Sequence, residues 1–186
     1  LATKTRGQKV SILFQQSQAP ISTDAYDFVM SARHPWISRW AGPTRDDQDI
    51  VVESLSQMGL DALMHRDVNS LSGGERRRVE LAATVAQNAQ TILLDEPVNH
   101  LDLHYQINLL QGALTKWRAE GRAVVMVMHD LNLAIRFSDH LLCLCGDGSI
   151  LQGETSAVAT TENLSTLLRY PLQALTLGDR SFFIPA

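Results

Sequence analysis

Between residues 71 and 128 the sequence alternates between helical and extended patterns, and this alternation limits the folds open to the chain. The apolar runs TILLD (91–95) and AVVMVM (123–128) each follow a stretch with helical periodicity, at 74–88 and at about 103–119. Strands separated by helices pair in parallel through right-handed crossovers. The sequence therefore predicts an α/β fold with a mostly parallel sheet, in which the carboxyl ends of the strands lie at one edge.

The remaining segments add a helical block and a tail. A strand is predicted at 10–14, and a further helix at 131–138 leads to a β-hairpin over 140–154. Thr44 can cap a helix running from residue 44 to residue 60. The predicted organisation is the end of the sheet domain with a glutamine loop at 1–19, a helical subdomain at 20–70, the main core at 71–155 and a helical tail at 156–186, with short helices over about 161–176.

Net charge, apolar runs and cysteines indicate which partners and which compartment to expect. The 186 residues carry a formal charge of −4, which gives no electrostatic reason to expect nucleic acid as a partner. No apolar run approaches the roughly 20 residues that span a bilayer, and no secretory leader is visible. Cys143 and Cys145 are one residue apart on a predicted strand, so they point to the same face and are poorly placed to bridge each other. Buried thiols in a reducing compartment are the expected state.

The segment LSGGE at 71–75 begins a helix with features of an anion site. Ser72 can cap that helix, and Glu75, three residues later, completes a capping box. Gly73 and Gly74 leave backbone N–H groups unshielded at the helix N-terminus, where anions bind readily. A well-capped helix without a ligand is the alternative interpretation.

Two carboxylates follow the buried strand in TILLDEP (91–97). Asp95 suits a direct or water-mediated contact with Mg²⁺, an ion that prefers hard oxygen ligands and retained waters. Glu96 is placed to orient a water for in-line attack on a phosphoryl group. A solvated acidic loop after a core strand would show the same residues.

Other polar residues are expected near the same edge of the sheet. His129 ends a predicted strand and either contacts developing phosphate charge beside Glu96 or is a core imidazole; the parallel topology favours the first. Gln15 and Gln16 leave a strand together, and either could reach a metal ion or a water. Asp102 is more typical of a loop or a helix N-cap than of a catalytic group.

Two patterns are not expected to be functional. His100 and His104 have the spacing of a helical metal pair, but no glutamate lies between them in the metalloprotease arrangement. The basic run from Arg76 to Arg78 is interpreted as a solvated helix face in an acidic chain.

In order and spacing, these segments resemble the ATP-binding cassette ATPases. LSGGE resembles the family signature, TILLDEP the Walker B strand with its catalytic glutamate, NHLD (99–102) the D-loop and VMHD (127–130) the switch-histidine segment. Gln15 in ILFQQ resembles the Q-loop glutamine. MSARHPW (30–36), together with MHDLNLAIRFSDHLLCL, is similar to ATPase subunits of importers for ferric siderophores, haem and cobalamin.

The resemblance implies a P-loop NTPase-like fold and two subunits that close head to tail around ATP. Asp95 and Gln15 would serve Mg²⁺, Glu96 would polarise the attacking water, and His129 would sense the γ-phosphate. ATP bound by the partner subunit would be contacted by residues of the signature and the D-loop: Leu71, Ser72, Gly73, Gly74, Glu75 and Asp102.

The resemblance also implies partners at a membrane. The helical subdomain, 20–70, would dock on the permease subunits, and Gln15 would link it to the nucleotide site. A substrate-binding protein would take part indirectly. The subunit would lie peripherally at the cytoplasmic face of the inner or plasma membrane, where its closure switches the permease between two states.

The sequence departs from the family pattern in three places. Phe14 stands where many relatives carry proline, and Val98 where threonine is common. More seriously, the 186 residues contain no G-x-x-x-x-G-K-[ST], the loop whose amides and lysine cradle phosphates. The chain starts with Leu1 rather than methionine, as though within a domain. We therefore expect the N-terminal portion to be missing and the chain alone to bind ATP weakly or not at all.

Two other classes of function remain open from the sequence. One is a cassette ATPase of translation or DNA maintenance; the latter type carries a long coiled coil that the short interval between Gln15 and Leu71 lacks. The other is an inactive interaction module, against which the retained Asp95, Glu96 and His129 argue.

Overall fold

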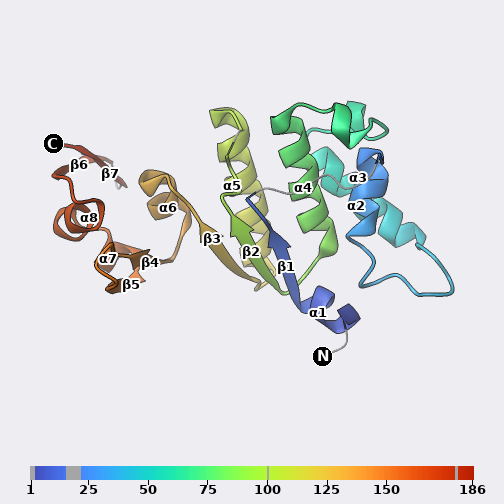
Figure 1. The fold of residues 1–186 in the computed structure, drawn as a ribbon, viewed down its shortest axis with the longest axis horizontal. Helices are drawn as coiled ribbons and strands as arrows, with labels where there is room; N and C mark the ends of the chain where they lie inside the picture. Colours follow the sequence, from blue (N-terminus) through green and yellow to red (C-terminus); the bar gives the residue numbers. More distant parts are fainter. Residues whose placement is uncertain (1–2, 16–21, 100, 179) are drawn as a thin grey trace. The chain divides into compact units, whose positions relative to one another are not determined.

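The computed structural model describes residues 3–15, 22–99, 101–178 and 180–186. Contacts divide the chain into two compact units, Leu1–Val127 and Met128–Ala186, which are described separately below. Figure 1 shows the elements of both units along the chain.

The first unit is built around a parallel sheet. The strands β1 (Val10–Leu13), β2 (Thr91–Asp95) and β3 (Ala123–Val127) pair in that order, and all pairs are parallel. This pairing confirms the predicted α/β fold with a parallel sheet. The helices of the unit are α1 (Thr3–Lys9), α2 (Ala25–Ser31), α3 (Arg45–Gln57), α4 (Gly73–Gln87) and α5 (Leu103–Ala119), with 3₁₀ turns at Asp61–Leu63 and Val68–Ser70.

One face of this sheet is buried beneath helices. The inward side chains alternate along the strands, and Leu13, Ile92 and Leu94 are nearly inaccessible to solvent. Helix α4 packs on β1 and α5 on β3. On the opposite face, Ile12 and Val125 flank Leu93 in register and are 48% and 57% exposed. The alternation follows from the two-residue period of a strand.

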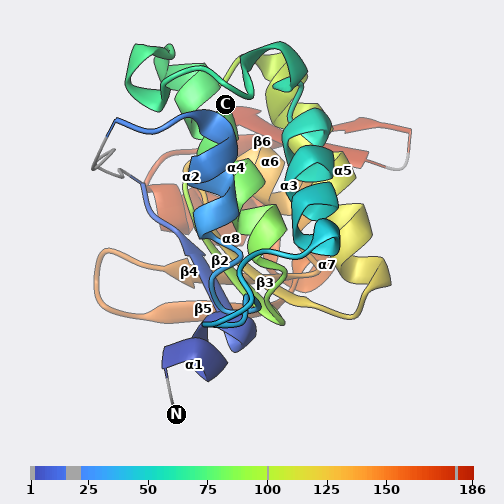
Figure 2. The same cartoon turned by 90° about the vertical axis from the view of Figure 1, so that its right-hand side faces the viewer.

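Helix α4 separates the sheet from the helical block. Helices α2 and α3 contact α4 and each other, and both views show α4 between them and the strands (Figures 1 and 2). Because α4 leads into β2 through only a short link, it runs antiparallel to the strands. Its N-terminus therefore lies toward the edge of the sheet at which β1 and β2 end.

A buried ion pair fixes the block. The Arg33 guanidinium donates to Asp47 at 2.8 Å and to the carbonyl of Ala86 at 2.8 Å, and the two charged side chains are each 7% exposed. Thr44 caps α3 as predicted, and Asp47 completes its capping box. Burial raises the pKa of the Asp47 carboxyl, but hydrogen bonds from Thr44 and Arg33 outweigh it, and the net pKa is lowered.

The second unit consists of short elements around a small apolar cluster. The hairpin of β4 (His140–Leu144) and β5 (Ile150–Glu154) is antiparallel, as predicted, and Gly148 in its turn has a φ of 87°. The remaining elements are α6 (Leu131–Phe137), α7 (Thr155–Val158), α8 (Thr161–Leu168), β6 (Leu172–Leu177) and β7 (Arg180–Pro185).

The predicted helical tail is wrong beyond Leu168. Arg169 adopts a left-handed conformation that ends α8, and Pro171 cannot continue a helix because it lacks an N–H donor. Strands β6 and β7 then form an antiparallel hairpin. It buries Leu172 and Phe183 against Leu164, so tertiary packing overrides the local helical pattern.

Two further observations concern membrane-spanning helices and the two cysteines. Among the residues that the structure describes, no helix combines the length and apolar character needed to cross a bilayer. Cys143 on β4 and Cys145 just after it are free thiols and half-buried, and burial raises the pKa of Cys143.

Substitution of Arg33 by leucine tests the ion pair. It leaves the Asp47 carboxylate buried without its cation, so we expect the free energy of unfolding to fall by about 3 kcal/mol, measured by urea denaturation. The control, Lys116→Met, breaks an exposed pair with Glu53 and should cost less than about 1 kcal/mol. Equal losses for the two variants would contradict the importance of the buried pair.

Candidate functional site

The candidate site lies where β1 and β2 end. The side-chain amide of Gln15 donates to Oε2 of Glu96 at 2.9 Å, although the two residues are 81 positions apart in the sequence. The amide of Asn99 donates to the same oxygen. Glu96 is only 6% exposed. The structure thus brings together two residues that the sequence placed in one site, and adds Asn99, which the sequence analysis missed.

The backbone of Glu96 is held in an uncommon conformation. Its φ of 46° lies in the left-handed region, which costs a non-glycine residue roughly 1–2 kcal/mol. Its N–H donates to the carbonyl of Val127 at 3.0 Å, and its own carbonyl accepts from the N–H of Asn99 at 3.3 Å. Such a conformation persists where surrounding contacts over-determine it, as at many functional sites.

A buried arginine supports this edge of the sheet. The Arg77 guanidinium donates to the carbonyls of Phe14 at 2.7 Å, Asp95 at 2.7 Å and Glu96 at 2.8 Å. It also pairs with Glu80 at 3.0 Å and is 5% exposed. The interpretation of this basic run as a solvated face is therefore wrong for Arg77.

A signal for this burial was present in the sequence. Positions 77, 81 and 85 lie on one face of a helix, and Leu81 and Val85 are core residues. An arginine on an otherwise apolar helix face needs buried acceptors for its N–H groups. The helical period could have indicated the burial of Arg77, but only the folded chain shows which carbonyls it contacts.

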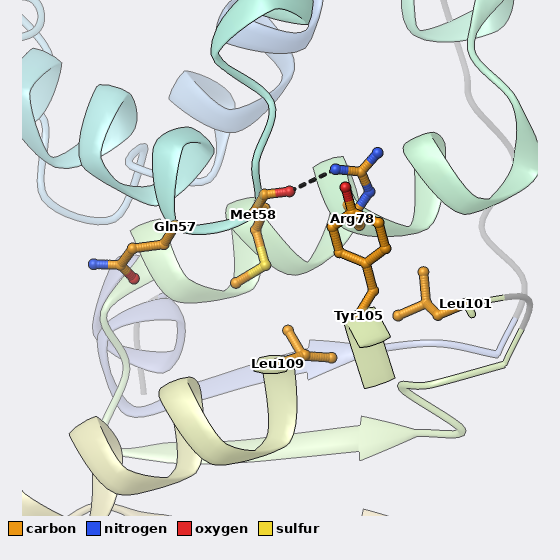
Figure 3. A pocket seen from close by; sticks show the side chains of 6 residues that line it. All are labelled: Gln57, Met58, Arg78, Leu101, Tyr105 and Leu109. Carbon is orange, nitrogen blue, oxygen red and sulfur yellow. Dashed lines mark hydrogen bonds between the residues drawn. The ribbon is translucent and has the colours of Figure 1, made fainter. Parts of the chain in front are cut away.

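The neighbouring Arg78 has a separate structural role. It donates to the carbonyls of Met58 at 2.7 Å and Gly59 at 3.1 Å, and its guanidinium lies 4.2 Å from the centre of the Tyr105 ring. Arg78 is on α4, and through these contacts it connects the end of α3 to α5. They surround the small pocket in Figure 3, lined by Gln57, Met58, Arg78, Leu101, Tyr105 and Leu109.

Asp95 presents a carboxylate at the same edge. Its carbonyl accepts from Arg77, whereas its carboxylate makes no hydrogen bond or ion pair with any residue that the structure describes. No group of three or more His, Cys, Asp or Glu in the described part of the chain could hold a metal by itself. Mg²⁺ commonly takes one or two protein oxygens and completes its shell with water and phosphate, so Asp95 and the Gln15 carbonyl fit that ion.

The predicted capping box at the start of α4 is confirmed. Glu75 accepts from the backbone N–H of Ser72 at 2.8 Å and from its hydroxyl at 2.7 Å, while its own N–H donates back to that hydroxyl at 3.3 Å. The hydrogen bond from the Ser72 hydroxyl holds the pKa of Glu75 below its usual range. Leu71 is buried and anchors the segment.

The two glycines follow in the first turn of α4. A Cβ added to Gly73 would meet nothing within 4 Å, so the packing of the described chain does not demand a glycine there. Because Gly73 and Gly74 have no side chains, the N–H groups of the first turn of α4 stay accessible to an anion.

The other predicted site residues have different outcomes. Asp102 accepts from the N–H of Tyr105 at 3.0 Å and is the N-cap of α5, as its sequence context indicated. His129 is exposed and belongs to the second unit, so its approach to Glu96 stays a prediction. Gln16 and His100 lie outside the described residues.

A parallel sheet, a capped helix that begins with two glycines and two acidic residues at the end of β2 are typical of the class of α/β nucleotide-binding ATPase domains. A model of the ABC transporter family matches residues 2–99. The chain is 33% identical to the achromobactin transport ATP-binding protein of Dickeya dadantii, over 99% of this chain and 68% of that protein. It is 34% identical to the petrobactin import ATP-binding protein of Bacillus anthracis, over 95% of this chain and 64% of that protein.

Solved structures agree with the sequence relatives. A metal-chelate type ABC transporter in an inward-facing conformation superposes with a TM-score of 0.82 at 28% identity, covering 96% of this chain and 72% of that one. A dimeric ATP-binding cassette with bound ADP and phosphate superposes with a TM-score of 0.71 at 28% identity, covering 82% and 66%.

The chain belongs to the ABC transporter family, as the resemblance indicated. It is homologous to the ATP-binding subunits of siderophore, hemin and cobalamin importers. It spans about two thirds of the length of the siderophore relatives named above.

Substitution of Ser72 tests the cap of the signature helix. Ser72→Ala removes the hydroxyl that accepts from the Glu75 N–H, so the free energy of unfolding should fall by about 1 kcal/mol, measured by urea denaturation. Ser72→Asn keeps a capping acceptor and should lose only a few tenths of a kcal/mol. The same loss in both variants would show that the cap does not stabilise α4.

Proposed function

We propose that the chain is the larger part of an ATP-hydrolysing subunit of an importer for an iron chelate, haem or cobalamin. The contact between Gln15 and Glu96 at the ends of β1 and β2 carries this proposal, because it joins two motifs of the family in one site. The substrate class rests on relatives whose names give achromobactin, petrobactin, hemin and cobalamin as their cargo.

In the proposed reaction Glu96 orients the water that attacks the γ-phosphate. The hydrogen bonds from Gln15 and Asn99 fix the direction of its carboxylate, and burial keeps bulk water from competing. Orientation of this kind lowers the entropic part of the barrier to in-line transfer. His129 is proposed to contact the γ-phosphate and so to report its presence.

Mg²⁺ is the cofactor that these residues fit. Asp95 and the side-chain oxygen of Gln15 would hold it, together with waters and phosphate oxygens. When bound, the ion would neutralise charge on the β- and γ-phosphates. Asp95 is suited to this role because its carboxylate has no competing cation among the described residues.

The signature segment is proposed to act on a second subunit. Ser72 and Gly74 would contact the γ-phosphate held by the partner, and Leu71, Gly73 and Glu75 would shape that contact. The exposed first turn of α4 and the space at Gly73 support it. The D-loop residue Asp102 would lie close to the same interface. A related cassette is a dimer with bound ADP and phosphate, which supports a dimer of this subunit; we propose that its two copies are arranged head to tail.

Transport requires partners at a membrane. We infer that the helical block of α2 and α3 docks on permease subunits, which in turn meet a substrate-binding protein. The subunit would then lie peripherally at the cytoplasmic face of the membrane. The block packs on α4, the helix that carries the signature, so a movement of the docked block would also move the residues proposed to contact the nucleotide.

The phosphate-binding loop is proposed to belong to a longer protein. The 186 residues contain no G-x-x-x-x-G-K-[ST], and the matched relatives are longer than this chain. The apolar residues exposed on one face of the sheet support an additional layer, because parallel sheets are usually covered on both faces.

The longer protein and the present chain should therefore differ in activity. We expect the 186-residue chain to release phosphate from ATP no faster than a protein-free blank, since its sequence has no G-x-x-x-x-G-K-[ST] to cradle the β- and γ-phosphates. The full-length protein should hydrolyse ATP under the same conditions. Substantial turnover by the folded 186-residue chain, with folding checked by circular dichroism, would refute the need for an additional loop.

Glu96→Gln in the full-length protein tests the proposed role of the carboxylate. The variant should bind ATP and dimerise but hydrolyse it at least about 100-fold more slowly, because an amide is a poor base for the attacking water. Size-exclusion chromatography with ATP measures dimerisation, and phosphate release measures turnover. Glu53→Gln, on the exposed surface of α3, is the matched control. A Glu96→Gln variant that turns over at the wild-type rate would refute the assignment.

A further inference from the structure

We propose that Arg77 is a positioning residue for ATP hydrolysis, which sets the separation and orientation of Gln15 and Glu96 by holding the backbone beside each of them. The proposal rests on the proposed function, since it concerns the same carboxylate. The geometry that carries it is a single buried guanidinium shared between the ends of two strands.

The contacts of Arg77 lie on both sides of the Gln15–Glu96 hydrogen bond. One terminal nitrogen, Nη1, donates to the carbonyl of Phe14, the residue that precedes Gln15. The other, Nη2, donates to the carbonyls of Asp95 and Glu96. The planar fork therefore ties the backbone that presents the amide to the backbone that presents the carboxylate.

Burial makes this arrangement demanding. A buried guanidinium needs acceptors for its donors. The two terminal nitrogens of Arg77 donate to three backbone carbonyls and to one carboxylate, that of Glu80, whereas its Nε has no hydrogen-bond partner in the described chain. Lysine could supply the charge but not the rigid fork that reaches carbonyls on two strands at once. The three carbonyls can converge on Arg77 only when the two strand ends hold this spacing.

The left-handed backbone of Glu96 gives a second reason why the hydrogen bond from Arg77 to the Glu96 carbonyl matters. The φ of 46° directs the Glu96 side chain toward Gln15 and Asn99, and this conformation needs external support. Arg77 supplies a hydrogen bond to the carbonyl of that residue. Loss of the contact should let the carboxylate move away from its hydrogen-bonded position, and small displacements of a catalytic group can cost orders of magnitude in rate.

The experiment compares Arg77→Gln, Arg77→Lys and Arg122→Gln in the full-length protein. We expect Arg77→Gln to lower kcat about tenfold or more with KM for ATP within about twofold, and Arg77→Lys to recover part of the loss. Arg122 is the matched control, because its guanidinium also donates to a backbone carbonyl, that of Ala89 at 2.9 Å, but at the opposite end of β2. Its substitution should leave both constants within about twofold.

The decisive measurement repeats Arg77→Gln in the Glu96→Gln background. If Arg77 acts through Glu96, the residual rate should change by less than about twofold, because the carboxylate that Arg77 positions has already been removed. A further tenfold fall in that background would overturn the proposal, as would a raised KM with unchanged kcat. Thermal melting of each variant shows whether it is still folded. If Arg77→Gln is not, Arg77→Lys, which keeps the buried charge, replaces it in the wild-type and Glu96→Gln backgrounds.

The two levels of the proposal fail in different ways. An inactive full-length wild-type protein would refute the proposed function itself. An active wild type whose Arg77 variants keep the full kcat would refute only the positioning role.

Discussion

The parallel pairing of β1 with β2 is the constraint on which the site depends. Leu13 lies beside Leu94, so the residues that follow each strand leave the sheet at the same edge. Gln15 and Glu96 meet there only because this register holds. A slip of β1 by one residue would turn the buried Leu13 to the opposite face, so core packing and site geometry are specified by the same contacts.

Buried polar groups convert this edge into a defined site. Arg77 satisfies three carbonyls, and the amides of Gln15 and Asn99 converge on one oxygen of Glu96. Helix α4 connects these features to the signature segment, because Ser72 is its N-cap and its second turn carries Arg77. One helix thus carries both the segment proposed to face the partner subunit and a buried support for the Glu96 backbone.

Sequence reasoning recovered features with local causes. The strand at 91–95, the helix cap at Thr44, the capping box at Ser72 and the helix cap at Asp102 each depend on residues a few positions apart. It failed where distant packing decides. The β6–β7 hairpin is stabilised by the burial of apolar side chains that lie far apart in the sequence, and the period of α4 did not by itself reveal the acceptors of Arg77.

By itself, the sequence determined the class of fold and the family, because strand and helix periods and motif order are properties of neighbouring residues. It also predicted which carboxylate acts in hydrolysis, and that role stays a prediction. Only the tertiary structure decided that Asn99 and Gln15 share Glu96 Oε2 and that Arg77 is buried behind them. Those contacts join segments separated by tens of residues. Their geometry follows from strand register and helix packing, which no local pattern specifies.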